Sequence, residues 1–181
     1  MRVITGTARG RRLVTPAGLA TRPTSEMAKE AIFSIIQFEL KGAMVLDLFA
    51  GSGQLGIEAL SRGARGAVFV DCAKEAADAI RQNLSTTGLG QNARLMQADA
   101  IPFLRSCRDT FDIALLDPPY QQGLVEEALQ LLPTRMSPGG IIICETERNE
   151  VLPTPGEGFT RRKEYRYGKA KVTTFRREEE V

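Results

Sequence analysis

The feature that most constrains this chain is a regular alternation of short, mostly apolar segments with helix-like segments. An apolar segment bounded by turn residues is typical of a strand that is buried on both faces of a sheet. The expected strands cover residues 44–48, 67–70, 93–97, 111–116 and 140–145. The expected helices between them cover 54–61, a segment ending at 84, a short helix around 103, and 123–132. This order predicts a doubly wound α/β domain with a mostly parallel sheet.

Both ends of the chain have a different pattern. Residues 3–5 and 13–15 surround a Gly/Arg-rich turn and could pair as a β-hairpin, and a helix is expected from Thr24 or Ser25 through Leu40. Residues 159–167 and 170–176 resemble an antiparallel hairpin that turns at Gly168 and Lys169. We therefore expect a basic N-terminal hairpin extension over 1–24 and one domain over 25–181, with a Rossmann-like, seven-stranded sheet that ends in the hairpin.

Composition excludes several classes of protein. Hydrophobic residues make up 43% of the 181 residues and charged residues 25%, as in an ordinary globular domain. No apolar run approaches the ~20 residues of a membrane span, and the N-terminus lacks the apolar core of a secretory signal. The three cysteines are scattered and histidine is absent, which excludes His-dependent triads and common zinc sites. We expect a cytoplasmic, monomeric protein with no membrane association and no metal.

The net charge of +2 hides an uneven distribution. Residues 1–25 contain five arginines and no acidic residue, residues 26–160 contain 11 basic and 18 acidic residues, and residues 161–177 contain eight basic residues and one acidic residue. Basic ends around an acidic centre suggest that a polyanion meets the ends while another ligand is handled in the centre. A charged surface that is merely solvated would give the same pattern at either end.

The first motif is the glycine-rich sequence DLFAGSGQLG, at residues 47–56, where the first expected strand turns into a helix. Gly51 and Gly53 allow the backbone to pass close to a ligand. The segment from Gly51 to Gly56 also matches the dinucleotide pattern GxGxxG, so a dinucleotide-binding fold competes. Asp47 separates the two interpretations, because a carboxylate there can face an ammonium group or bound water but would repel a pyrophosphate.

Two further carboxylates end the next strands. Asp71 could accept both hydroxyls of a ribose, as in many adenosine-binding sites, or could cap the helix that starts near Cys72. Asp99, followed by Ala100, could accept an adenine amine or could cap the next helix. Three acids at successive strand ends lie on the edge where open α/β sheets bind ligands.

The tetrapeptide Asp117-Pro118-Pro119-Tyr120 directly follows the fourth expected strand. The two prolines fix the backbone and leave the Pro118 carbonyl free of regular pairing. This carbonyl and the Asp117 carboxylate could hold the two hydrogens of an amino group and direct its lone pair toward a methyl donor. Tyr120 offers a ring on which a base could stack. The tetrapeptide therefore predicts methyl transfer to an exocyclic amine.

Taken together, DLFAGSG, FVD, ADA and DPPY resemble the motif series of class I S-adenosylmethionine (SAM)-dependent amino methyltransferases. The opening RVITGTARGRRL and the segment RPTSEMAKEAIFSII are similar to bacterial small-subunit rRNA guanine-N2 methyltransferases of the RsmD type. The resemblance covers nearly the whole chain. It implies SAM as the methyl donor, N2 of one guanine in 16S rRNA as the target, and an assembled or assembling 30S subunit as the substrate.

The resemblance also implies roles for particular residues. The cofactor-binding residues would be Arg22, Thr24, Asp47, Phe49, Ala50, Gly51, Ser52, Gly53, Asp71, Cys72, Asp99 and Ala100. The target amine would be bound by Asp117, Pro118, Pro119 and Tyr120, and RNA phosphates by Arg2, Arg9, Arg11 and Arg12. This chain has Lys29 where the family often has arginine, and lysine keeps the charge but lacks the planar fork that makes bidentate contacts.

Other activities remain open at this point. A similar amino methyltransferase could act on adenine or cytosine in DNA or on a protein glutamine, although the chain has no obvious DNA target-recognition domain. An NAD-dependent Rossmann enzyme is disfavoured by Asp47 and leaves the Pro-Pro tetrapeptide unexplained. An RNA-binding module without catalysis would be expected to have degraded donor and acceptor motifs, which are intact here.

Overall fold

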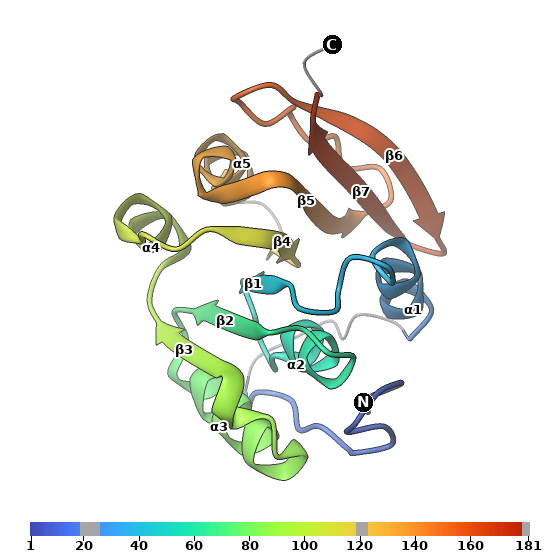
Figure 1. Ribbon diagram of the computed structural model, residues 1–181, viewed down its shortest axis with the longest axis vertical. Helices are drawn as coiled ribbons and strands as arrows, with labels where there is room; N and C mark the ends of the chain where they lie inside the picture. Colours follow the sequence, from blue (N-terminus) through green and yellow to red (C-terminus); the bar gives the residue numbers. More distant parts are fainter. Residues whose placement is uncertain (19–25, 119–122, 179–181) are drawn as a thin grey trace.

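The computed structural model describes residues 1–18, 26–118 and 123–178. Seven strands within these residues form one sheet in the order β3-β2-β1-β4-β5-β7-β6 (Figure 1). Their bounds are β1 Met44–Leu48, β2 Gly66–Asp71, β3 Ala93–Gln97, β4 Phe111–Leu116, β5 Met136–Glu147, β6 Phe159–Tyr167 and β7 Ala170–Arg177. Strands β1 to β5 are parallel, and β7 runs antiparallel to both β5 and β6. The predicted fold class is confirmed.

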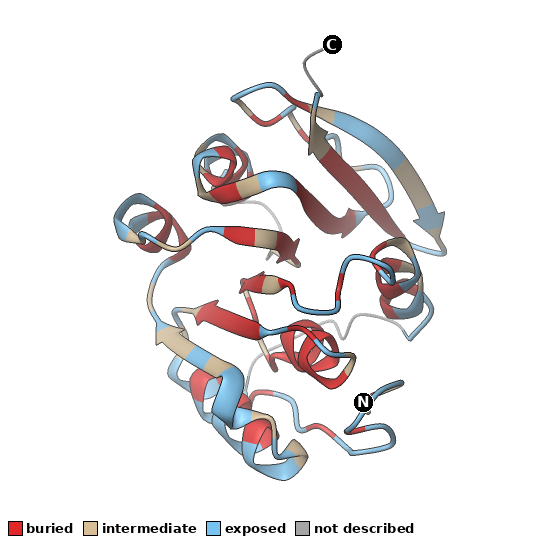
Figure 2. Cartoon of the chain, in the orientation of Figure 1, coloured by how far each residue is buried: buried red, intermediate tan, exposed pale blue. Residues whose placement is uncertain are grey.

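Helices cover both faces of the sheet. Their bounds are α1 Glu26–Ile35, α2 Gln54–Ser61, α3 Lys74–Thr87, α4 Ala100–Ser106 and α5 Leu124–Leu131, with short 3-10 turns at Gly90–Asn92 and Leu132–Arg135. Helices α1, α2 and α3 pack into the core on one face, and α4 and α5 pack into the core on the other. Figure 2 shows the central strands buried between these layers, whereas β6 at the sheet edge is largely exposed.

Side chains of the central strands alternate between the two cores. In β1, Val45 packs toward α1, α2 and α3, whereas Leu46 and Leu48 pack toward α4 and α5. Helix α2 lies especially close to the sheet, because a Cβ added at Gly56 would come within 2.4 Å of Cε1 of Phe69. The third glycine of the motif therefore has a packing role, as in other Rossmann-like folds.

The order of the strands creates a switch point between β1 and β4. From β1 the chain adds β2 and then β3 on one side, and it later returns to place β4 and β5 on the other side. The two neighbouring strands end level with each other, since Leu48 pairs with Leu116. Open α/β sheets bind ligands outside the carboxyl ends of the strands at such a point. The glycine turn and the start of the DPPY tetrapeptide both lie there.

The two largest differences from the predicted boundaries lie in α1 and β5. Helix α1 ends at Ile35, five residues before the expected end at Leu40, although Ile36 and Leu40 are buried as expected. The side chain of Gln37 donates to the carbonyl of Ser34, which stabilises the helix end. Strand β5 begins at Met136, before the expected 140, because Met136 pairs with Phe111 across an irregular segment before regular pairing resumes at Ile141.

The predicted N-terminal hairpin is reduced to one antiparallel bridge between Arg2 and Arg12. A longer ladder does not form because the N–H groups of Ile4 and Thr5 donate to the carboxylate of Glu58 in α2. The segment is nevertheless well packed, since Val3, Ala8 and Leu13 are buried in the core shared with α1, α2 and α3. The proposed boundary at residue 24 lies outside the described residues and stays a prediction.

Among the described residues, no helix combines the length and the apolar character needed to cross a membrane.

Candidate active site

The glycine turn has an unusual backbone. Phe49 adopts φ 62°, a left-handed conformation that is uncommon for a bulky residue, and Gly51 and Gly53 adopt φ 58° and 77°. A Cβ added at Gly51 would meet no atom within 4 Å, whereas one at Gly53 would approach Ile80 at 3.1 Å. Gly51 thus exposes bare backbone to open space, and Gly53 allows the turn to pack on α3. Backbone strain of this kind is concentrated at functional sites.

Asp47 points into the protein beneath this turn. Its side chain accepts a 2.9 Å hydrogen bond from the N–H of Gly56, and the residue is only 1% exposed. Burial raises the pKa of Asp47 well above its usual value, and the negative charges of Asp117 and Asp71 raise it further. Asp47 therefore helps to fix the start of α2 through its bond from Gly56.

Asp71, at the end of β2, joins two loops of the site. Its Oδ2 accepts from the N–H of Gly51 at 2.9 Å, and its Oδ1 accepts from the N–H of Ala73 at 3.0 Å. The alternative that Asp71 caps the following helix is thus partly realised, because Ala73 is the N-cap residue of α3. Each carboxylate oxygen retains acceptor capacity for a second donor, such as a ribose hydroxyl.

Cys72 and Asp99 lie together beyond the ends of β2 and β3. Burial raises the pKa of the Cys72 thiol, and the carboxylates of Asp71 and Asp99 raise it further. Asp99 precedes α4 in extended conformation but makes no side-chain capping bond, while Ala100 is buried at the first position of the helix. The capping alternative for the Asp99 side chain is therefore not realised.

Asp117 and Pro118 directly follow β4 and are half-buried. The charge of Asp117 raises the pKa of Asp47 in the neighbouring strand and also that of Cys144 in β5, whose largest shift comes from burial. Because Leu116 pairs with Leu48, Asp117 lies at the same carboxyl ends of the strands as the glycine turn. Pro119 and Tyr120, and the predicted cofactor ligands Arg22 and Thr24, lie outside the described residues.

The predicted RNA-binding arginines are all exposed but differ in their contacts. Arg2 forms an ion pair with Glu26 at 3.2 Å. Within the described part of the chain, the side chains of Arg9, Arg11 and Arg12 form no hydrogen bond or ion pair, so they are available to a polyanion. The basic C-terminal hairpin differs, because many of its arginines bind backbone carbonyls, as Arg161 does at Leu152 and Arg177 at Pro133.

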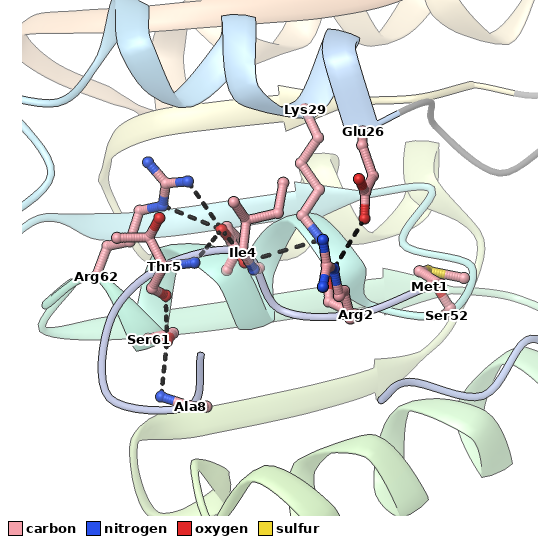
Figure 3. A network of polar contacts seen from close by, with 12 residues as sticks. Met1, Arg2, Ile4, Thr5, Ala8, Glu26, Lys29, Ser52, Ser61 and Arg62 are labelled. Carbon is pink, nitrogen blue, oxygen red and sulfur yellow. Dashed lines mark hydrogen bonds and ion pairs between the residues drawn. The ribbon is translucent and has the colours of Figure 1, made fainter. Parts of the chain in front are cut away.

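Sequence reasoning missed a polar network that attaches the N-terminal segment to the domain (Figure 3). Lys29 is 1% exposed, donates to the carbonyl of Arg2 at 2.9 Å and lies 3.8 Å from the carboxylate of Glu58. Glu58 also binds Arg62, and the hydroxyl of Ser61 accepts from the N–H of Ala8. Burial lowers the pKa of Lys29. Lys29, noted as a departure from the family pattern, thus holds the N-terminal segment in place.

The signal for this network was present in α2, where Glu58 lies between the apolar residues Ile57 and Ala59 of a buried helix. Asn83 in α3 was also missed, and it is fully buried. Among the described residues, no group of three or more His, Cys, Asp or Glu side chains is arranged to hold a metal ion.

Comparison with known proteins decides the family. The family described as Conserved hypothetical protein 95 matches residues 1–176. The chain belongs to this family. The match covers the N-terminal segment, the glycine turn and DPPY alike, so the resemblance to RsmD-type proteins seen in the sequence is confirmed.

Curated relatives of this Conserved hypothetical protein 95 member align over almost its whole length. Ribosomal RNA small subunit methyltransferase D of Escherichia coli strain K12 is 34% identical over 180 residues, which cover 98% of this chain and 90% of that protein. YlbH of Bacillus subtilis strain 168 is 40% identical over 183 residues, which cover 98% of this chain and 99% of that protein.

Solved structures of similar proteins have the same fold. The Escherichia coli protein yhhF is 35% identical with a TM-score of 0.87, and the match covers 98% of each chain. Protein TTHA0928 of Thermus thermophilus is 29% identical with a TM-score of 0.81, and the match covers 96% of this chain and 98% of that one. The class I methyltransferase architecture predicted from the motifs is therefore confirmed for this member of the family.

Proposed function

We propose that this protein transfers a methyl group from SAM to the exocyclic N2 amine of a guanine in 16S rRNA. The observation that carries the proposal is the juxtaposition at the switch point. There the glycine turn after β1 and Asp117 after β4 lie side by side at the carboxyl ends of the two strands. The name of the Escherichia coli relative, a small-subunit rRNA methyltransferase, supports rRNA as the substrate.

The charges at this edge fit SAM better than NAD. Asp47, Asp71 and Asp117 lie close enough for the latter two to raise the pKa of Asp47. A cluster of carboxylates attracts the sulfonium and ammonium groups of SAM, whereas it would repel the pyrophosphate of a dinucleotide. The open backbone at Gly51 provides room for the methionine part, and the neighbouring Asp71, Cys72 and Asp99 provide acceptors for the ribose and adenine.

SAM, when bound, supplies a methyl group on a positively charged sulfur. The chain's own residues would hold the acceptor amine. The Asp117 carboxylate and the Pro118 carbonyl would each accept one N–H of the amine, which favours a pyramidal nitrogen with its lone pair directed at the methyl group. On methylation the amine nitrogen would lose a proton, for which Asp117 is the nearest proposed acceptor.

The base must leave its surroundings in the RNA to reach this edge, as in other enzymes that modify bases. Arg9, Arg11 and Arg12 would bind phosphates nearby, since their side chains are exposed and not engaged by the described part of the chain. We further propose that the substrate is the assembled or assembling 30S subunit and that the enzyme acts as a cytoplasmic monomer.

Incubation with radiolabelled SAM and under-methylated 30S subunits tests the proposal. We expect label in 16S rRNA, at N2 of one guanine after nuclease digestion. Label in DNA or protein instead, or no label at all, would contradict it. An Asp117→Ala variant should still bind SAM in calorimetry but should lose turnover, and undiminished turnover would refute the role of Asp117.

A further inference from the structure

Two points of the N-terminal segment, Met1 and Val14, converge on Ser52 in the glycine turn. At the first point, the Ser52 hydroxyl lies 3.5 Å from Sδ of Met1, and Figure 3 shows these two residues side by side. At the second point, Asn83 exchanges two hydrogen bonds with the backbone of Val14, at 2.8 and 3.0 Å, and donates to the carbonyl of Ser52 at 2.9 Å. The segment between Met1 and Val14 contains the exposed Arg9, Arg11 and Arg12.

Asn83 connects the two regions directly. It is 0% exposed, and its amide uses both hydrogens and its oxygen in these three bonds. Because the peptide unit is planar, fixing the Ser52 carbonyl also fixes the N–H of Gly53, which donates to Ala50 at 2.8 Å. Asn83 therefore restrains the second half of the turn that exposes Gly51.

We propose that Asn83 is a positioning residue that couples RNA binding by the N-terminal segment to SAM binding by the glycine turn. An RNA held by the three arginines restrains Val14, Val14 restrains Asn83, and Asn83 holds the turn in its binding conformation. Linkage requires the reverse effect as well, so SAM must strengthen RNA binding by the same factor. The inference rests on the proposed function, because it requires both ligands.

The experiment compares Asn83→Asp with Ser61→Ala. The aspartate keeps the size of the side chain but has no hydrogen to donate to Ser52 or Val14. Ser61 holds the same N-terminal segment, through Ala8 and Thr5, but has no bond to the glycine turn, so Ser61→Ala is the matched control. Circular dichroism first establishes that both variants are folded.

The measurement is equilibrium dialysis of radiolabelled S-adenosylhomocysteine, a non-reactive product, with and without saturating under-methylated 30S subunits. In the wild type we expect the 30S subunits to lower Kd by about fivefold or more, the usual size of such couplings. Asn83→Asp should reduce the ratio of the Kd without 30S subunits to the Kd with them to about one, and it should weaken binding in the absence of RNA. Ser61→Ala should keep the wild-type ratio. An unchanged ratio in folded Asn83→Asp would overturn the proposal.

A measurement on the wild type keeps the test decisive if Asn83→Asp does not fold. Hydrogen exchange followed by NMR should show that S-adenosylhomocysteine slows exchange at the N–H of Val14, bound to Asn83, more than at the N–H of Ile4, bound to Glu58. Equal effects at the two amides would contradict the coupling. If the protein neither binds S-adenosylhomocysteine nor labels 30S subunits, the proposed function fails. If the wild-type protein does both but its Kd for S-adenosylhomocysteine is the same with and without 30S subunits, only the coupling fails.

Discussion

Asp71 and Gly51, which lie 20 residues apart, are joined by a 2.9 Å hydrogen bond from the Gly51 N–H to Oδ2 of Asp71. The same carboxylate accepts from Ala73 through its other oxygen. One side chain thus holds the glycine turn against the start of α3, so the site's shape and its proposed ribose contact depend on the same residue.

Asp71→Asn should therefore weaken both the fold and SAM binding. Asparagine has one acceptor oxygen, so its NH₂ group would face either Gly51 or Ala73 donor to donor. We expect a loss of about 1–3 kcal/mol in the free energy of unfolding and at least about a tenfold rise in the Kd for SAM. Urea denaturation and calorimetry measure the two effects. Asp78→Asn, on the exposed surface of α3, should change neither.

Asp47→Asn should affect the stability of the protein and its binding of SAM in opposite directions. Because the pKa of Asp47 is raised in the folded state, its contribution to stability is fully present below its ordinary unfolded pKa and is lost as pH rises through the folded value. The asparagine variant has no such titration, and its side-chain oxygen can still accept from Gly56. We expect the variant to gain stability relative to the wild type as pH rises, yet to bind SAM more weakly.

Thermal denaturation across a pH series checks the first effect, and calorimetry with SAM checks the second. A stability difference that is constant with pH would contradict the raised pKa of Asp47. SAM affinity equal to that of the wild type would show that the carboxylate charge contributes nothing to ligand binding.

Gly56→Ala should destabilise the protein because its Cβ would lie 2.4 Å from the ring of Phe69. Overpacking of this kind costs about 1–3 kcal/mol. Urea denaturation should show the loss, and adding Phe69→Leu should recover part of it. Gly90→Ala is the control, since its Cβ would come no closer than 3.8 Å to another residue. A fully stable Gly56→Ala variant would show that α2 can move away from the sheet.

Replacing Arg9, Arg11 and Arg12 with glutamine should weaken binding to 16S rRNA and reduce its salt dependence. Each lost phosphate contact should lower the slope of log K against log salt by about 0.7–0.9. The paired change Arg161→Gln and Arg162→Gln is the control, because these side chains bind backbone carbonyls of the protein itself. If the control reduces the slope more than the N-terminal variant does, the RNA-binding surface is the C-terminal hairpin.

The sheet and the site were predictable to different extents. The strands and the Gly-rich turn follow from local sequence patterns, so α2, β1, β3 and β4 lie where the sequence placed them. The carboxylates at the strand ends also followed, because parallel strands bring their carboxyl ends to one edge. The end of α1 did not, since the buried Ile36 and Leu40 extend the apolar pattern beyond the helix itself.

The attachment of the N-terminal segment depends on partners that are distant in the chain. Glu58 receives the N–H of Ile4 from 54 residues away, and Asn83 receives that of Val14 from 69 residues away. No local periodicity encodes such pairs. Residues 3–5 and 13–15 surround a Gly/Arg-rich turn, which suggested a hairpin. Val3 and Leu13 do bond across this turn, whereas the N–H groups of Ile4, Thr5 and Val14 donate to helix side chains.

The contact between Met1 and Ser52 has a practical consequence for producing the protein. Any purification tag fused ahead of Met1 would begin next to the glycine turn, where it could obstruct the donor site and mimic an inactive enzyme. Strand β7 ends where Arg176 pairs with Ile141 near the start of regular pairing in β5, so the end of β7 lies at the opposite end of the strands from the glycine turn, and the C-terminus is the alternative position for a tag.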